Sequence, residues 1–278
     1  MYNTKQIEIY FHPGLGKTGS TFLQHNFFPE LKGIRYLHKP LPKAAKALQK
    51  ARHGRYLLSR EHDNGIGETI ARFAAKFPQV RIILVLRRHD KWIASQYRRL
   101  TKNGRGIFFD EFIDIHENQG RWDKGLLDFY GLIRSVEHTT GRPPLVLFHD
   151  ELQTTPHVFF EKIANFTGCS YDKDKVSLRY VHKAWNDRQL KALRKVARQT
   201  FYKRLGKYKK YNSPMERRYR KTLSHLIMYF YWLVPLSRDE KQRPLIAQHL
   251  LDEIREAYAD DWQKCKAYAQ AHPVEKIR

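Results

Sequence analysis

The stretch IYFHPGLGKTGSTFLQHNFFP, residues 9–29, combines a short apolar run, a glycine-rich turn with one lysine, and the start of a helical pattern. Backbone N–H groups in the first turn of a helix lack partners within the helix, and the helix dipole favours a negative charge there. Lys17 adds a positive charge at this point, and Thr18, Ser20 and Thr21 add hydroxyl groups. An ordinary strand–helix turn with a capping hydroxyl is the alternative. The combination of glycines, a lysine and three hydroxyl residues directly after an apolar run favours a phosphate site.

The turn is not a Walker A motif, although Gly16-Lys17-Thr18 resembles the end of one. That motif has a glycine five residues before the one that precedes the lysine, and Phe11 occupies this position. The difference argues against a nucleotide kinase or NTPase. Such an enzyme stays open as an alternative, because Asp150 follows an apolar run and would suit a Mg²⁺ ligand.

Four apolar runs separated by helical patterns predict an α/β fold class, with a parallel β-sheet flanked by helices. The runs are residues 7–11, 56–58, 82–86 and 145–148. Strands that alternate with helices form parallel sheets covered on both faces, and ligands bind at the carboxyl ends of the strands. We therefore expect four segments to converge at that edge: residues 13–21, 59–62, 87–90 and 149–151.

The domain organisation is predicted from the absence of a linker or repeat in the 278 residues. We expect a single domain, 1–278, with an α/β core over 1–170 and a basic, mostly helical extension over 171–278. The pattern from Asp187 onward is helical, and no further strand is evident.

Two features of the chain predict a cytoplasmic location. Cys169 and Cys265 are too few for a disulfide framework and suit a reducing compartment, and the N-terminus has no signal-peptide pattern.

The most apolar window, residues 226–236, is too short to span a bilayer. We expect a buried helix there. A helix on the membrane surface, which would place the protein at the inner face of the membrane, is the alternative.

The net charge of +24 is concentrated between Arg179 and Lys221. This segment contains sixteen lysines and arginines but only two acidic residues. So dense a cluster is typical of a protein with an anionic partner, although a solvated helical face would also explain it. Interleaved aromatic residues such as Trp185 and Tyr219 could face sugar rings, but at least half of them fit the core side of amphipathic helices. No zinc-finger or RNA-binding signature is present, so a non-enzymatic nucleic-acid- or polyanion-binding protein rests on charge alone, and we expect no nucleic-acid partner.

The motif LGKTGST, residues 15–21, resembles the loop of the sulfotransferases that use 3′-phosphoadenosine-5′-phosphosulfate (PAPS). Their loop reads approximately L-P-K-[ST]-G-[ST]-T, and Gly16 replaces the proline. The resemblance implies that Lys17 lies against the bridging oxygen of the breaking bond, and that Phe22 stands where many relatives carry a tryptophan that contacts adenine. The residues implied to hold the 5′-phosphosulfate are Gly16, Lys17, Thr18, Gly19, Ser20 and Thr21.

Two further matches support the resemblance. In LVLRRHDKWIASQY, Arg87 and Ser95 have the spacing of the family's ligands for the 3′-phosphate, with Arg88 as the alternative to Arg87. A weaker match, residues 145–168, resembles a family strand, turn and helix to which we assign a structural role. The resemblance covers roughly residues 5–170. Beyond it, Arg179 and Lys183 stand near the position of another nucleotide-contacting loop.

The resemblance implies a PAPS-dependent sulfotransferase that moves a sulfuryl group to a hydroxyl or amine and releases 3′-phosphoadenosine-5′-phosphate (PAP), with no metal required. Lys17 and the loop amides would stabilise the leaving group. Glu61 stands just past the second predicted strand, near the catalytic glutamate of carbohydrate sulfotransferases, and is the expected base. His62 is the alternative, because cytosolic small-molecule sulfotransferases use a histidine.

Glu61 has an alternative interpretation without a catalytic role. It could be a surface carboxylate that pairs with Arg60 or a lysine. His12, beside the turn, is expected to be packed beneath it. We expect the acceptor to be an anionic glycan, a polysaccharide or a glycolipid, and the sequence predicts no oligomeric state.

Overall fold

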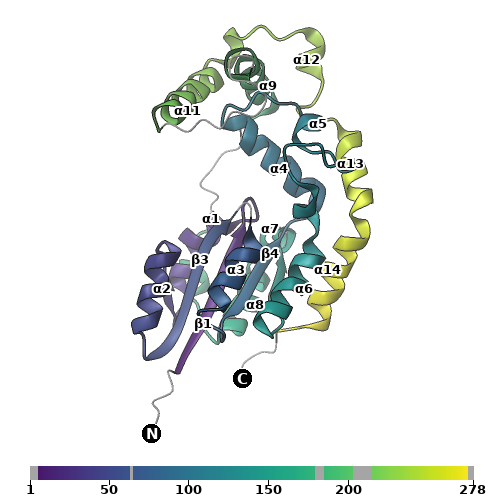
Figure 1. Ribbon diagram of the computed structural model, residues 1–278. Helices are drawn as coiled ribbons and strands as arrows, with labels where there is room; N and C mark the ends of the chain where they lie inside the picture. The colour runs from purple at the N-terminus through teal and green to yellow at the C-terminus, as the bar shows by residue number, and fades with distance from the viewer. Residues whose placement is uncertain (1–5, 63–64, 179–184, 203–213, 275–278) are drawn as a thin grey trace. The chain divides into compact units, whose positions relative to one another are not determined.

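The computed structural model describes residues 6–62, 65–178, 185–202 and 214–274 of the chain (Figure 1). The chain divides into two compact units that are interleaved along the sequence. The first unit consists of Met1–Arg88, Asp128–Val181 and Ala259–Arg278, and the second of His89–Leu127 and His182–Tyr258. The predicted single domain, with a core that ends at residue 170, stays a prediction.

The first unit is built on a five-stranded sheet in the order β2-β3-β1-β4-β5, and every neighbouring pair of strands is parallel. This confirms the predicted α/β fold class. The strands are β1 (Gln6–Leu15), β2 (Arg35–Leu37), β3 (His53–His62), β4 (Arg81–Leu86) and β5 (Leu145–Phe148).

Two features of the sheet differ from the prediction. The edge strand β2 was not predicted, because it has only three residues and only Leu37 among them is buried. Strands β1 and β3 run on to Leu15 and His62, so residues 13–15 and 59–62 end strands rather than begin loops. They continue because they pair with each other, with Gly14 opposite Glu61, and backbone pairing does not depend on apolar side chains.

Helices cover both faces of this sheet (Figure 1). One face carries α1 (Ser20–Phe22), which continues as a π-helical turn (Leu23–Phe27) and a 3-10 turn (Phe28–Glu30), together with α7 (His149–Thr154) and α8 (Pro156–Thr167). The other face carries α3 (Ile66–Ala74), α6 (Phe129–Thr140) and α14 (Ala259–Ala271), and α2 (Leu41–Lys50) packs beside β3.

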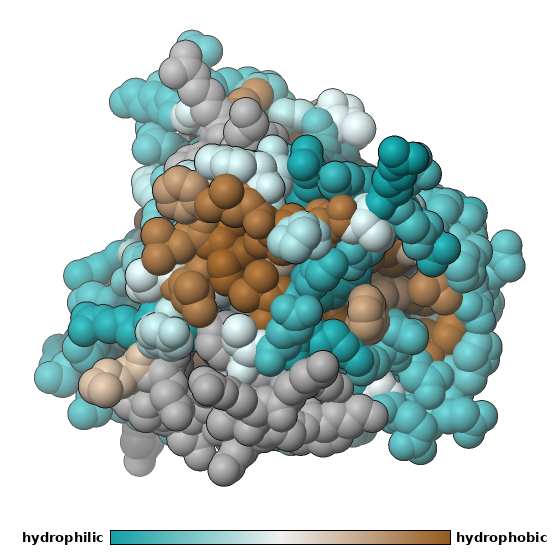
Figure 2. All heavy atoms as spheres, turned by 90° about the horizontal axis from the view of Figure 1, so that it is seen from above, coloured by the Kyte–Doolittle hydropathy of each residue, from teal (hydrophilic) through white to brown (hydrophobic). Residues whose placement is uncertain are grey.

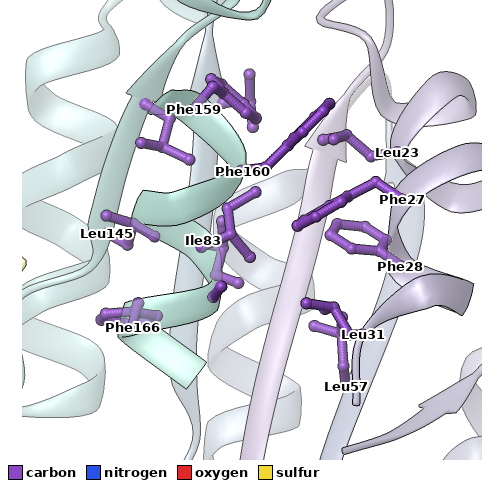
Figure 3. Packing of buried hydrophobic residues seen from close by; sticks show 14 of the residues in the cluster. Leu23, Phe27, Phe28, Leu31, Leu57, Ile83, Leu145, Phe159, Phe160 and Phe166 are labelled. Carbon is purple, nitrogen blue, oxygen red and sulfur yellow. The ribbon is translucent and has the colours of Figure 1, made fainter. Parts of the chain in front are cut away.

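Aromatic side chains fill the space between the sheet and the helical segments after β1 and β5 (Figure 3). The ring of Phe27 stacks on that of Phe160, with centroids 4.3 Å apart, and Phe28 and Phe159 are also fully buried. Burial of one such side chain contributes about 1.5–3 kcal/mol. Because Phe27 and Phe28 anchor the segment that begins at Ser20, the turn before it is held firmly against the sheet.

The second unit is helical. Its helices are α4 (His89–Lys102), α5 (Phe109–Phe112), α9 (Asp187–Ala197), α11 (Pro214–Tyr229), α12 (Arg238–Gln242) and α13 (Gln248–Ala257), with short turns at Lys124–Leu127, Arg198–Tyr202 and Tyr231–Leu233. From Asp187 onward the described residues form helices, turns and loops without a strand, as predicted.

Cations of α9 and of the turn that follows it hold the second unit together. Lys191 is 5% exposed, and its ammonium group donates to three main-chain oxygens at the end of α12. This burial lowers the pKa of Lys191. Arg198 donates two hydrogen bonds, of 2.7 and 3.2 Å, to the carboxylate of Glu111, and Lys195 pairs with Glu240 at 2.9 Å. The basic segment is therefore not one continuous solvated face.

The expectation of a buried helix over residues 226–236 is wrong. This window contains the end of α11 and the turn after it, and Leu226, Phe230 and Leu233 are exposed. Met228 is fully buried, so the segment is attached to its unit by one side only.

Candidate functional site

The turn between β1 and α1 contains two residues in the left-handed region, Lys17 with φ 73° and Gly19 with φ 90°. A left-handed conformation costs a non-glycine residue about 1–2 kcal/mol, and strain of this kind clusters at functional sites. Gly19 also lies so close to α7 that a Cβ atom would be 2.6 Å from the Cδ2 atom of Leu152. Arg87 donates from Nη1 to the main-chain oxygen of Lys17 at 3.2 Å, which supports the unusual conformation.

The hydroxyl groups of the turn have different roles. Thr18 and Ser20 are buried and donate to the main-chain oxygen of Leu15, at 2.7 and 3.4 Å. Ser20 lies over Gly14. A Cβ atom on Gly14 would be 2.1 Å from the Oγ atom of Ser20. Thr21 is exposed, as is Lys17. Thr18 and Ser20 therefore shape the turn from inside, and Lys17 and Thr21 are its exposed side chains.

The two candidate bases, Glu61 and His62, lie on opposite faces of the sheet, because successive side chains of a strand alternate. On the α1 face, Glu61 accepts a hydrogen bond of 3.0 Å from the hydroxyl of Thr21. On the other face, the ring of His62 lies edge-on to Phe11, 6.4 Å between centroids, and Phe11 packs against Phe73 of α3. Glu61 is thus the candidate that contacts the turn, and its hydrogen-bond partner among the described residues is Thr21 rather than Arg60 or a lysine.

A buried polar network lies beneath the turn. His12 is fully buried, and its Nδ1 atom lies 2.8 Å from the hydroxyl of Ser59, which also accepts from the amide of Gln24 at 2.9 Å. Since Ser59 accepts from Gln24, its own proton can be donated to Nδ1 of His12. Burial lowers the pKa of His12 to about 3, so the imidazole is neutral and acts as a packed residue, as expected.

This network predicts a loss of stability in mild acid. The folded protein keeps His12 neutral, whereas the unfolded chain takes up a proton near the ordinary pKa of 6.5. Stability should therefore fall as the pH drops from 6.5 towards 3, by about 1.4 kcal/mol per pH unit from this residue. Denaturant unfolding of the wild type and of His12→Gln, at several pH values between 7 and 5, measures the difference in slope.

In that experiment, His12→Gln should flatten the pH dependence, even if the variant is less stable at pH 7. His25→Gln is the matched control, because His25 is an exposed histidine on the helical segment that follows the same turn. It should keep the wild-type slope. Identical slopes for His12→Gln and the wild type would contradict the assignment.

A pocket of about 520 Å³ opens beside Glu61. The hydrogen-bonded pair of Thr21 and Glu61 forms part of its wall, so the pocket reaches both the turn and the end of β3. The rings of His25 and His38 lie 5.5 Å apart in this wall. The remaining lining residues are Gln24, Lys39, Pro40, Ser59 and Arg60. A molecule bound here would meet one carboxylate and several basic side chains.

The predicted convergence of segments is confirmed within the first unit. Residues 13–21 and 59–62 meet through Thr21 and Glu61, and Arg87 reaches the turn at Lys17. The segment 149–151 also lies against the turn, because a Cβ atom on Gly19 would be 3.5 Å from the ring of His149.

The other predicted site residues lie in several places. Gly16 is buried in the turn, and Arg88 is half-buried directly after Arg87. The ring of Phe22 is nearly parallel to that of Phe160, with centroids 6.2 Å apart, so it belongs to the edge of the core. Ser95 is half-buried on α4, in the second unit. Arg179 and Lys183 lie outside the described residues.

The segment after β5 has structural contacts. Asp150 is in the first turn of α7, and Glu151 pairs with Lys162 of α8 at 2.8 Å. No group of three or more histidine, cysteine, aspartate and glutamate side chains that could hold a metal ion is found in the described part of the chain.

Several residues of the site were not singled out from the sequence. Gly14 allows Ser20 to lie on β1, and a glycine inside a strand is the signal that could have revealed this close approach. Gln24 and Ser59 complete the network with His12. His38 carried no signal, because it follows the edge strand β2 that the pattern did not reveal.

The fold described above is similar to that of a sulfotransferase from Alicyclobacillus acidocaldarius. The two chains are 14% identical, the match covers 68% of this chain and 91% of that chain, and the TM-score is 0.50. The chain has the sulfotransferase fold. The resemblance drawn from LGKTGST is therefore confirmed at the level of the fold.

A second structure with the sulfotransferase fold is mouse sulfotransferase SULT7A1, which was solved in complex with PAP. It is 15% identical, and the match covers 97% of this chain and 92% of that chain with a TM-score of 0.42. No protein-family model and no curated protein sequence matches the chain.

Proposed function

We propose that the chain transfers a sulfuryl group from PAPS to a hydroxyl or amine of an acceptor, with the turn at residues 16–21 holding the donor and Glu61 acting as general base. The hydrogen bond between Thr21 and Glu61 carries this proposal, because it joins the anion-binding turn to a carboxylate in the wall of a pocket. A nucleophile in that pocket would lie beside both groups.

The turn fits an anionic donor on three counts: it begins a helix, it has two left-handed residues, and its lysine is exposed. Turns of this kind direct main-chain N–H groups at anions. When bound, PAPS would supply a sulfuryl group whose bond to the leaving phosphate breaks as sulfur bonds to the acceptor. Lys17 would neutralise the negative charge on that phosphate. Thr18 and Ser20 would contribute through main-chain N–H groups, since their hydroxyls hold Leu15.

The nucleotide end of the donor is assigned by resemblance. Arg87 is proposed to bind the 3′-phosphate, and its hydrogen bond to the main chain of Lys17 would couple the two phosphate positions. Ser95 is the proposed second ligand of that phosphate, and Phe22 would lie near the adenine. Arg179 and Lys183 complete the proposed nucleotide contacts.

Glu61 is proposed to remove the proton of the attacking hydroxyl or amine. The hydrogen bond from Thr21 fixes one carboxylate oxygen, which orients the group towards the pocket. A base positioned in this way contributes roughly 10²–10⁴-fold to the rate. His62 is the less favoured base, because its contact with Phe11 places it on the other face of the sheet.

The acceptor is proposed to be an anionic glycan, polysaccharide or glycolipid. The basic lining of the pocket supports this class, because His25, His38, Lys39 and Arg60 could pair with carboxylate or sulfate groups of the acceptor. The hydroxyl or amine to be sulfated would then point at Glu61.

The test of the proposed function is a thermal-shift comparison of PAP with ATP, each with and without Mg²⁺. A ligand at 100 times its Kd stabilises the folded protein by about 2.7 kcal/mol, and the melting temperature rises by roughly 2–4 °C per kcal/mol in a domain of similar size. We expect a rise of several degrees with PAP that does not need Mg²⁺, and a much smaller rise with ATP.

Two other results would redirect the assignment. A rise only with ATP and Mg²⁺ would favour a nucleotide kinase or NTPase. Equal rises with any polyanion, lost steeply as salt is added, would favour the polyanion-binding alternative. A positive result with PAP justifies screening acceptors with radiolabelled PAPS, using acidic glycans against neutral ones of the same size.

A further inference from the structure

One side of α11 and the turn after it carries large apolar and aromatic side chains that are exposed to solvent. Figure 2 shows a large patch of hydrophobic side chains with hydrophilic ones around it. We call the following set the α11 face. Its members are Met215 (80% exposed), Tyr219 (65%), Leu226 (50%), Tyr229 (60%), Phe230 (49%), Trp232 (58%) and Leu233 (72%).

The α11 face follows helical spacing. Met215, Tyr219 and Leu226 fall on one side of the helix, whereas Ser224 and Met228, which are fully buried, fall on the opposite side. An amphipathic helix of a globular protein normally turns its large apolar side chains inward. Here the inner side carries Ser224 and Met228, and most of the large apolar side chains of the helix face out.

The inner side of α11 is closely packed, so the helix has no room to turn its apolar face inward. A Cβ atom on Gly104 would lie 2.6 Å from the hydroxyl of Ser224. The side-chain amide of Gln189, on α9, donates to the main-chain oxygen of Met228 at 3.2 Å. At the edge of the α11 face, the ring centroids of Tyr229 and Trp185 are 5.3 Å apart. Exposed apolar patches rimmed by polar residues mark interaction sites.

The residue types of the α11 face suit the surface of a membrane. Tyrosine and tryptophan combine an apolar ring with a polar atom, and they are enriched where lipid headgroups meet the acyl chains. Trp232 forms ring contacts with Phe230 and Tyr231, at 5.5 and 5.7 Å, so the aromatic groups act as one cluster. A helix that lies on a bilayer buries such a face in the headgroup region.

Charge favours an anionic lipid surface over a second copy of the chain. Arg218 is exposed on α11, and helical spacing puts it at the edge of the α11 face, in line with Tyr229. Each lysine or arginine held near an anionic membrane contributes roughly 1 kcal/mol of binding. A second copy would bring the same cation and a net charge of +24, and like charges repel.

We propose that the α11 face binds the surface of an anionic lipid bilayer, with α11 parallel to the membrane plane, its aromatic cluster among the headgroups, and Arg218 at the lipid phosphates. No described helix is long and apolar enough to cross a membrane. The proposal is independent of the proposed sulfotransferase activity and would hold for a chain without it.

The test is co-sedimentation of the full chain with vesicles of phosphatidylcholine alone, or of phosphatidylcholine with phosphatidylglycerol. We expect strong binding to the anionic vesicles only. The double variant Leu226→Asp/Leu233→Asp should weaken that binding by about tenfold or more, because it removes apolar contacts and adds two negative charges. Arg218→Gln should weaken it by about fivefold through lost charge alone.

Val158→Asp is the matched control, because Val158 is a 51% exposed apolar residue on α8, outside the α11 face. It should bind anionic vesicles much as the wild type does, apart from the effect of one charge. Circular dichroism and the melting temperature of each variant show that the fold is kept, as expected for exposed positions.

Two results would overturn the proposal. Binding of the double aspartate variant at the level of Val158→Asp would mean that general positive charge, and not the α11 face, holds the protein on the vesicles. A wild-type chain that ignores vesicles but forms a dimer in sedimentation velocity, with the dimer lost in the double variant, would assign the α11 face to self-association.

Discussion

Glu61→Gln is expected to lower the turnover number by about 10²–10⁴-fold while leaving the binding of PAP unchanged. The amide keeps an oxygen that can accept the hydrogen bond from Thr21, so the local geometry is preserved. It cannot take up a proton at neutral pH, which removes the proposed base. Glu61 is exposed, so the substitution should not affect folding. Initial rates with radiolabelled PAPS and the best acceptor of the screen give the turnover, and the thermal shift with PAP gives binding.

Two further variants make this experiment specific. Glu68→Gln removes an exposed carboxylate on α3 of the same unit and should leave the rate unchanged. His62→Phe keeps a ring against Phe11 and removes both nitrogen atoms. A large loss of rate in His62→Phe with near-normal rates in Glu61→Gln would move the base to the other face of the sheet.

Lys17→Ala is expected to lower the turnover number by about 10²–10³-fold, the usual cost of losing one group that stabilises developing negative charge. Alanine keeps a Cβ atom at the same positive φ, so the backbone strain is similar in both proteins. The hydrogen bond from Arg87 goes to the main-chain oxygen of residue 17 and does not depend on the side chain. The loss should therefore arise from the missing ammonium group.

The measurement is the turnover number and the Michaelis constant for PAPS. Lys46→Ala is the control, since Lys46 is an exposed lysine on α2 of the same unit and lies apart from the turn in the sequence. It changes the net charge equally and should leave both constants near wild type. If Lys17→Ala turned over acceptor at a near-normal rate, Lys17 would have no part in stabilising the leaving group.

The core of the fold was predictable because buried parallel strands are nearly continuous apolar runs. The extra strand β2 and the true ends of β1 and β3 could not be predicted in this way. Strand β2 has three residues at the edge of the sheet, where side chains carry little signal. The ends of β1 and β3 are polar, and they remain strands because Gly14 and Glu61 pair through the backbone. Pairing between distant segments leaves no local pattern.

The site was predictable in part for the same kind of reason. Parallel strands end at one edge, so the meetings of Lys17 with Arg87 and of Thr21 with Glu61 could be expected from strand order. The directions in which the side chains point could not be expected from strand order. Whether Glu61 or His62 faces the turn depends on the register of β3, which a shift of one residue would reverse. The apolar window over residues 226–236 predicts a buried helix, because a sequence pattern does not show which side of a helix packs against its neighbours.

The helix α14 has a consequence for how the chain is made. It closes the first unit. The ring of Trp262 packs against that of Phe148 in β5, with centroids 5.0 Å apart. Asp261 accepts a hydrogen bond of 3.0 Å from the main-chain N–H of Tyr130. On the ribosome, the sheet is therefore synthesised long before the helix that covers Phe148. A nascent chain that stops before residue 259 should expose this apolar edge and engage chaperones, and the first unit should become protease-resistant only after α14 has emerged.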